Sequence, residues 1–105
     1  MWICFNDGFI SAVQSKDNPD ILVIRSRRLK DLENVVGSDR SIEVNAGTDY
    51  KYRTEISKSE WAEIVSDRIM DTDYTNFKNS VKDVPLHNLY VKMWNLHYKY
   101  QSRYS

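Results

Sequence analysis

Basic side chains gather on two segments of the chain whose residues alternate as in β-strands. They are Arg25, Arg27, Lys51 and Arg53, with Tyr52 beside the last two. Because the side chains of a strand point alternately to its two faces, the four cations share one face if the apolar residues of both strands face the core. Guanidinium groups bind phosphate and carboxylate through paired hydrogen bonds, so the pattern predicts an anion-binding face. The simpler interpretation is that these side chains only solvate an uncovered face and pair with Glu43 and Glu55.

Polar and aromatic residues are also interleaved in the segment 73–79. We predict that three of its residues contribute to a ligand pocket, namely Tyr74, Asn76 and Lys78. In the alternative interpretation, Tyr74 and Phe77 form one helical turn with both rings turned inward, and Asn76 and Lys78 face solvent.

The C-terminal segment 82–105 combines basic and aromatic residues. Its cations are Lys82, Lys92, Lys99 and Arg103, and its aromatic residues are Tyr90, Trp94, Tyr98, Tyr100 and Tyr104. Such interleaving suits single-stranded nucleic acid or the groove of a partner protein. The plainer interpretation, which we prefer, is a helix whose aromatic side chains pack on the sheet or across a homodimer.

The spacing of the reactive residues matches no catalytic or metal-binding signature. His87 and His97 lie ten residues apart on one predicted helix without a cysteine pair, so a zinc site is not expected. The segment 71–76 begins like a calcium loop but lacks its glycine and its final glutamate. The three glycines form no phosphate-binding loop, and there is no nucleophile elbow. We therefore predict no catalytic residue, metal or cofactor, and favour a protein that is not an enzyme while leaving catalysis open.

The composition is typical of a small intracellular domain. Within 105 residues, 15 Lys and Arg balance 15 Asp and Glu, whereas general nucleic-acid binders are usually basic. One cysteine forms no intrachain disulfide, and no apolar run is long enough to span a bilayer. The first residues lack the basic and apolar regions of a signal peptide. We expect one domain over residues 1–105, in the cytoplasm, with Cys4 as a small buried side chain.

The hydrophobic pattern predicts an α+β fold. Strands are expected at 1–5, 9–15, 21–24, 42–44 and 50–56, helices at 29–36, after 57 and after 83, and a short helical or irregular connector at 73–81. This order predicts a ferredoxin-like layered sandwich. In it, helices cover one face of an antiparallel sheet of about five strands, and the opposite face stays partly free.

Short motifs predict how these elements begin and end. Asp7-Gly8 suits a tight hairpin turn in which both residues tolerate positive φ, and 46–49 is a second turn. Gly37 is placed to end a helix with a left-handed conformation. In Ser57-Lys58-Ser59-Glu60, the Ser57 hydroxyl is expected to accept from a first-turn amide while Glu60 reaches back.

The strand and helix periodicities also predict which side chains are buried. Tyr50, Tyr52, Thr54 and Ile56 should share one face of their strand. The helix after residue 57 should turn Trp61, Ile64, Val65 and Ile69 inward. The last helix should present Leu86, Leu89, Tyr90, Met93 and Trp94, with Leu96 or His97, to the core.

Several short sequence motifs are spread along nearly the whole chain. They are Met1-Trp2-Ile3, Gly8–Gln14, Ile21–Arg27, Thr48–Arg53, Asp73–Lys78 and Tyr90–Trp94. Through them the chain resembles a family of short hypothetical proteins of bacteria and tailed phages. The resemblance implies a cytoplasmic protein of bacterial or phage origin and supplies no catalytic residue. By analogy, phage proteins of this size are often inhibitors or sponges directed at a host defence system.

Three function classes stay open at this point. We favour a non-enzymatic binding protein that occupies a host protein or a small anionic ligand such as a nucleotide signal. The second class is a nucleic-acid-binding protein that uses the basic sheet face and the C-terminal helix. The third is an enzyme that acts on a phosphorylated substrate. A homodimer through a helical face is compatible with all three, and no membrane partner is expected.

Overall fold

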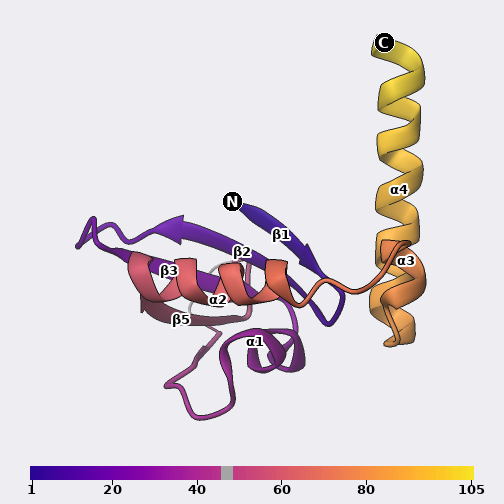
Figure 1. Ribbon diagram of the computed structural model, residues 1–105. Helices are drawn as coiled ribbons and strands as arrows, with labels where there is room; N and C mark the ends of the chain where they lie inside the picture. Colours follow the sequence, from indigo (N-terminus) through magenta and orange to yellow (C-terminus); the bar gives the residue numbers. More distant parts are fainter. Residues whose placement is uncertain (46–48) are drawn as a thin grey trace. The chain divides into compact units, whose positions relative to one another are not determined.

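The computed structural model of the protein describes residues 1–45 and 49–105 (Figure 1). The chain forms two compact units, Met1–Asp73 and Tyr74–Ser105. The turn predicted at 46–49 lies outside the described residues, except for Asp49.

The first unit is built around an antiparallel sheet. Its strands are β1 (Trp2–Phe5), β2 (Gly8–Gln14), β3 (Ile21–Ser26), β4 (Glu43–Val44) and β5 (Tyr52–Ser57). They lie in the order β1-β2-β3-β5-β4, and every neighbouring pair is antiparallel. The predicted fold class is confirmed, because this is an α+β arrangement with a five-stranded antiparallel sheet and helices packed on it, consistent with a ferredoxin-like layered sandwich.

Two helices of the first unit, α1 (Leu29–Val36) and α2 (Lys58–Met70), pack on the sheet. Beneath them, Ile10 and Ile24 are fully buried together with Leu32 of α1. Trp61 of α2 joins the same cluster, and its ring lies 6.3 Å from that of Phe5, edge to face. Since each such side chain contributes roughly 1.5–3 kcal/mol when buried, this cluster decides which face the helices cover.

The opposite face of the sheet carries the residues that alternate with this core. The strand register aligns one residue of every strand into a single row across the sheet. In spatial order the row is Trp2, Ser11, Arg25, Arg53 and Glu43. Residues directly opposite one another point to the same side, so these side chains share what we call the outer face.

The tight hairpin turn predicted between β1 and β2 is present, one residue earlier than Asp7-Gly8. Phe5 pairs with Gly8, which leaves Asn6 and Asp7 as the loop. Among the described residues, positive φ occurs at Gly37, as predicted, and at Asn45, so the hairpin turn forms without positive φ at Asp7 or Gly8. Gly8 meets a different constraint, because a Cβ there would lie 2.7 Å from the Asp31 carbonyl oxygen.

An ion pair ties this turn to both helices. Arg68 donates two hydrogen bonds to the Asp7 carboxylate, at 2.7 and 2.9 Å, and a third to the Asn34 carbonyl. The Asn34 amide in turn donates to the Asp7 carbonyl. The Arg68 guanidinium also lies 5.0 Å from the Phe5 ring, so it occupies the inward side of the last turn of α2. Ile69 is 65% exposed for that reason, and its predicted inward position is wrong.

The start of α2 follows the predicted capping motif in part. The Ser57 hydroxyl accepts a hydrogen bond from the Glu60 amide at 3.2 Å, as expected. The Glu60 carboxylate, however, binds Arg40 at 2.8 Å instead of reaching back to the cap. Glu60 therefore pairs with a cation 20 residues upstream instead of completing the capping box.

The second unit consists of α3 (Phe77–Ser80) and α4 (Val84–Tyr104). The Asp83 carboxylate accepts from the Leu86 amide, and a proline lies in the first turn of α4, as the sequence indicates. Leu86 and Tyr90 are buried, and the Tyr90 ring lies 5.2 Å from that of Phe77.

Most of α4 does not reach a core. Leu89, Trp94 and Leu96 are exposed by 44%, 49% and 63%, so their predicted core positions are wrong. Because α3 is a single turn, it covers one side of the first turns of α4. In the part of the chain that the structure describes, no helix is long and apolar enough to cross a membrane.

Replacing Gly8 by alanine tests the close approach of α1 to the hairpin. The added methyl group would meet a backbone oxygen, which cannot rotate away, so we expect Gly8→Ala to lower the free energy of unfolding by about 1–3 kcal/mol. Urea denaturation followed by far-UV circular dichroism measures this loss. An unchanged midpoint would contradict the proposed contact. Ser66→Ala at an exposed position of α2 is the control, and it should not show the same loss.

Candidate functional site

Two arginines face each other at the centre of the outer face. Arg25 of β3 lies directly opposite Arg53 of β5, and Arg53 lies directly opposite Glu43 of β4. Like charges in direct cross-strand pairs destabilise a sheet, by an amount on the order of 0.2–1 kcal/mol. The local environment of the two arginines must therefore compensate for their mutual repulsion.

Tyr50 supplies part of this compensation. The guanidinium carbons of Arg25 and Arg27 each lie 4.4 Å from the centre of its ring, a distance at which cation and ring attract. The ring is only 5% exposed. Tyr50 lies before the start of β5 and packs with outer-face residues, so its predicted place beside Thr54 and Ile56 is wrong.

Hydrogen bonds hold the same arginines in position. One Nη of Arg25 donates to the Ser11 hydroxyl at 2.7 Å, and one Nη of Arg27 donates to the Asp49 carbonyl at 3.0 Å. Ser11 is fully buried in this arrangement. The Arg25 Nε is also buried, and it has no hydrogen-bond partner among the described residues. Neutral groups thus hold Arg25 and Arg27 in position.

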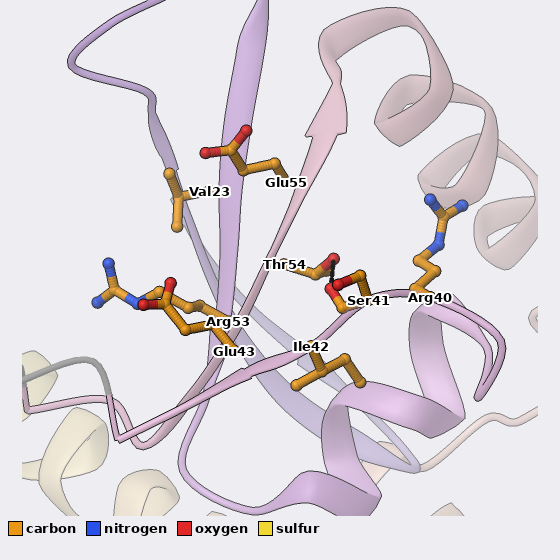
Figure 2. Close-up of a pocket in the computed structure, with 8 residues that line it drawn as sticks. All are labelled: Val23, Arg40, Ser41, Ile42, Glu43, Arg53, Thr54 and Glu55. Carbon is orange, nitrogen blue, oxygen red and sulfur yellow. Dashed lines mark hydrogen bonds between the residues drawn. The ribbon is translucent and has the colours of Figure 1, made fainter.

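A cavity of about 720 Å³ adjoins Arg53 at the edge of the sheet (Figure 2). It is lined by Val23, Arg40, Ser41, Ile42, Glu43, Arg53, Thr54 and Glu55. The cavity follows from the shortness of β4, which leaves β5 after Arg53 without a paired strand on that side. The Thr54 hydroxyl instead donates to the Ser41 carbonyl at 2.9 Å. We call this cavity the edge pocket.

The charged groups of the edge pocket point in different directions. In Figure 2, Arg53, Glu43 and Glu55 lie on the same side of β5 as Val23, whereas Arg40 is turned away from them. Arg40 pairs with Glu60 through two hydrogen bonds, at 2.8 and 3.3 Å. This hydrogen-bonded pairing lowers the pKa of Glu60 and raises that of Arg40. Arg53 is therefore the cation that this pocket shares with the outer face.

The remaining residues predicted on these strands lie apart from the arginines. Lys51 is exposed, with its Nζ 5.6 Å from the centre of the Tyr52 ring. Tyr52 is half-buried and packs against the helix-covered core, so it belongs to the opposite face of β5. Cys4 is half-buried, and burial raises the pKa of its thiol.

The predicted residues of the second unit have local structural contacts. Asn76 accepts from the Asn79 amide and caps α3. Tyr74 contacts Phe77 edge to face at 5.7 Å, and the Lys78 Nζ lies 4.4 Å from the centre of the Trp94 ring. The two rings contact each other, but Tyr74 lies before α3, so the alternative interpretation of one helical turn is wrong. Lys78 contacts an aromatic face instead of facing only solvent.

Sequence reasoning missed Ser11, Tyr50 and Arg40 as members of the site. Ser11 alternates with buried Ile10 and Ala12, so its place on the Arg25 side could have been deduced once the β2–β3 register was known. The prediction for Tyr50 is wrong because the alternation at 50–56 indicates one strand, whereas β5 begins only at Tyr52.

Among the described residues, no group of three or more His, Cys, Asp or Glu side chains is arranged to hold a metal ion. No family model, curated protein or solved structure matches the chain. The function therefore has to be argued from the outer face and the edge pocket.

The Arg40–Glu60 pair predicts a pH dependence of stability. Because the pKa of Glu60 is lower in the folded protein than its usual value of 4.5, the pair stabilises the fold above that pH and is lost as the pH falls through the lowered pKa. We expect Glu60→Gln to lower the urea midpoint at pH 7, and the difference from the wild type to shrink as the pH falls below 4.5. A difference that does not shrink on acidification would contradict this assignment, and Glu63→Gln on the same helix is the control.

Tyr50 is expected to organise the arginine cluster through its ring. Tyr50→Ala removes a buried aromatic side chain and should cost about 3–5 kcal/mol of stability. Tyr50→Phe keeps the ring and should cost much less. Equal losses in the two variants, measured by urea denaturation, would show that the ring contacts with Arg25 and Arg27 are unimportant.

Proposed function

We propose that the protein binds an anionic ligand on the outer face of its sheet, through the paired Arg25 and Arg53 and through Arg27, which follows the end of β3. The ligand carries a phosphate or carboxylate group, which guanidinium groups recognise through paired hydrogen bonds. The protein then acts by holding its ligand. An inhibitory or sponge-like role of a bacterial or phage protein is one setting in which such binding would be sufficient.

The observation that carries the proposal is the direct opposition of Arg25 and Arg53. Two cations that lie directly opposite each other repel, and an anion that binds between or beside them lowers this repulsion. Tyr50 and Ser11 fix Arg25 before any ligand arrives, so little side-chain entropy is lost on binding. The edge pocket next to Arg53 offers room for the rest of a small molecule.

The acidic residues on the same face limit what can bind. Glu43 lies directly opposite Arg53, and Glu55 lies directly opposite Val23. A long polyanion crossing this face would bring further phosphates against these carboxylates. A compact anion that reaches the arginines without extending over the carboxylates fits the charge pattern better than a nucleic-acid strand does.

The test measures binding of a defined anion by isothermal titration calorimetry. With inorganic pyrophosphate as the probe, Arg27→Ala and Arg53→Ala should each weaken binding roughly ten-fold or more, because each removes charge-assisted hydrogen bonds. Arg25 is left intact, since it packs on Tyr50 and Ser11 and its loss would disturb the fold.

A matched control separates the site from general charge effects. Lys16→Ala also removes one positive charge, but from an exposed turn between β2 and β3, and should leave pyrophosphate binding unchanged. Equal weakening by Lys16→Ala would point to non-specific attraction. Unchanged binding in the Arg27→Ala/Arg53→Ala double variant would remove the outer face as the site.

A further inference from the structure

We propose that the anionic ligand is a nucleoside phosphate, whose base stacks on Trp2 while its phosphate binds the arginines. This inference rests on the proposed anion site and adds the class of ligand. It comes from the row that crosses the sheet, because Trp2 stands at one end of the same row that contains Arg25 and Arg53.

Trp2 has the exposure and the support of a stacking platform. It is 72% exposed, although it lies within β1 and tryptophan is the largest apolar side chain. The Phe9 ring of β2 contacts it edge to face, with 5.9 Å between the ring centres. This contact steadies one side of the indole and leaves most of its surface accessible. Stacking of a base on such an aromatic ring increases affinity by roughly ten-fold or more.

The separation of the strands that carry Trp2 and Arg25 suits one nucleotide. Ser11 is the single residue between Trp2 and Arg25 in the row, and neighbouring strands lie about 4.8 Å apart. The Arg25 side chain leans across this gap, because its Nη donates to the Ser11 hydroxyl at 2.7 Å. The backbones of β1 and β3 are two strand spacings apart, about 10 Å, and the Arg25 guanidinium lies towards β1 from its own strand. A nucleoside phosphate spans such a gap, whereas a free phosphate would use the arginine end alone.

The order of chemical groups along the row also matches the order of groups in a mononucleotide. An apolar ring comes first, a cluster of cations lies in the middle, and the carboxylate of Glu43 closes the far end. A base, a sugar and a phosphate group would meet the ring and the cations in that order. A longer strand would carry its next phosphate towards Glu43, which would repel it.

Calorimetry with three probes tests this assignment. We expect adenosine monophosphate to bind the wild-type protein at least ten-fold more tightly than ribose 5-phosphate, which has the same phosphate and lacks the base. Trp2→Ala should reduce the affinity for adenosine monophosphate to that for ribose 5-phosphate and leave the latter unchanged. Trp2→Phe, which keeps an aromatic ring, should retain most of the difference. Trp94→Ala removes a half-exposed tryptophan of the second unit and is the control.

Each contrary outcome identifies which assignment fails. Equal binding of the two phosphates by the wild type would overturn the stacking role of Trp2 and leave the anion site standing. Equal loss of both probes in Trp2→Ala, with Trp2→Phe restoring neither, would assign Trp2 a role in the fold instead. No binding of either phosphate would overturn the anion site itself. Tighter binding of a single-stranded oligonucleotide, falling steeply with salt, would make the face a nucleic-acid surface and overturn the mononucleotide assignment.

Discussion

The pairing of β3 along both of its edges determines where the charged side chains of the outer face lie. Ile24 is fully buried under the helices, and its neighbour Arg25 consequently points to the other side. A slip of one residue would exchange these two side chains, burying a guanidinium and exposing an isoleucine. The burial of Ile24 alone is worth roughly 1.5–3 kcal/mol, more than the repulsion of about 0.2–1 kcal/mol between Arg25 and Arg53. The hydrophobic core therefore enforces an arrangement of charges that would not form on electrostatic grounds.

The surroundings of the arginines reduce this repulsion without cancelling the charge. The Tyr50 ring attracts both Arg25 and Arg27, and each contact of this kind contributes about 0.5–1 kcal/mol or more when water is excluded. Carboxylates placed at the same positions would have neutralised the cluster and removed its attraction for an anion. The only carboxylate directly opposite one of these arginines among the described strands is Glu43, at the edge of the sheet. The neutral contacts that stabilise Arg25 and Arg27 would therefore also prepare them for the proposed anion.

The sequence predicted those features that depend on local periodicity. The alternation of apolar and polar residues located the five strands, and the same alternation placed Arg25 and Arg53 on one face. It failed where a contact joins distant segments. The Arg40–Glu60 pair, the approach of Asp31 to Gly8 and the insertion of Tyr50 beside the arginines all depend on how loops return to the sheet. For α4, helical spacing correctly located the helix, but it could not show that a one-turn α3 would cover so little of it.

The arginines of the outer face offer the proposed ligand a fixed positive charge. Arginine stays protonated at every physiological pH, so Arg25, Arg27 and Arg53 supply charge and hydrogen-bond donors but exchange no proton. For the proposed ligand, a phosphate monoester gains its second negative charge near pH 6, so its ionisation would control the strength of binding. At neutral pH such a ligand presents two charges to a cluster that is already preorganised by Tyr50 and Ser11. Discrimination between one anion and another must come from groups outside the cluster, and the exposed indole of Trp2 is the group that the sheet register places in line with it.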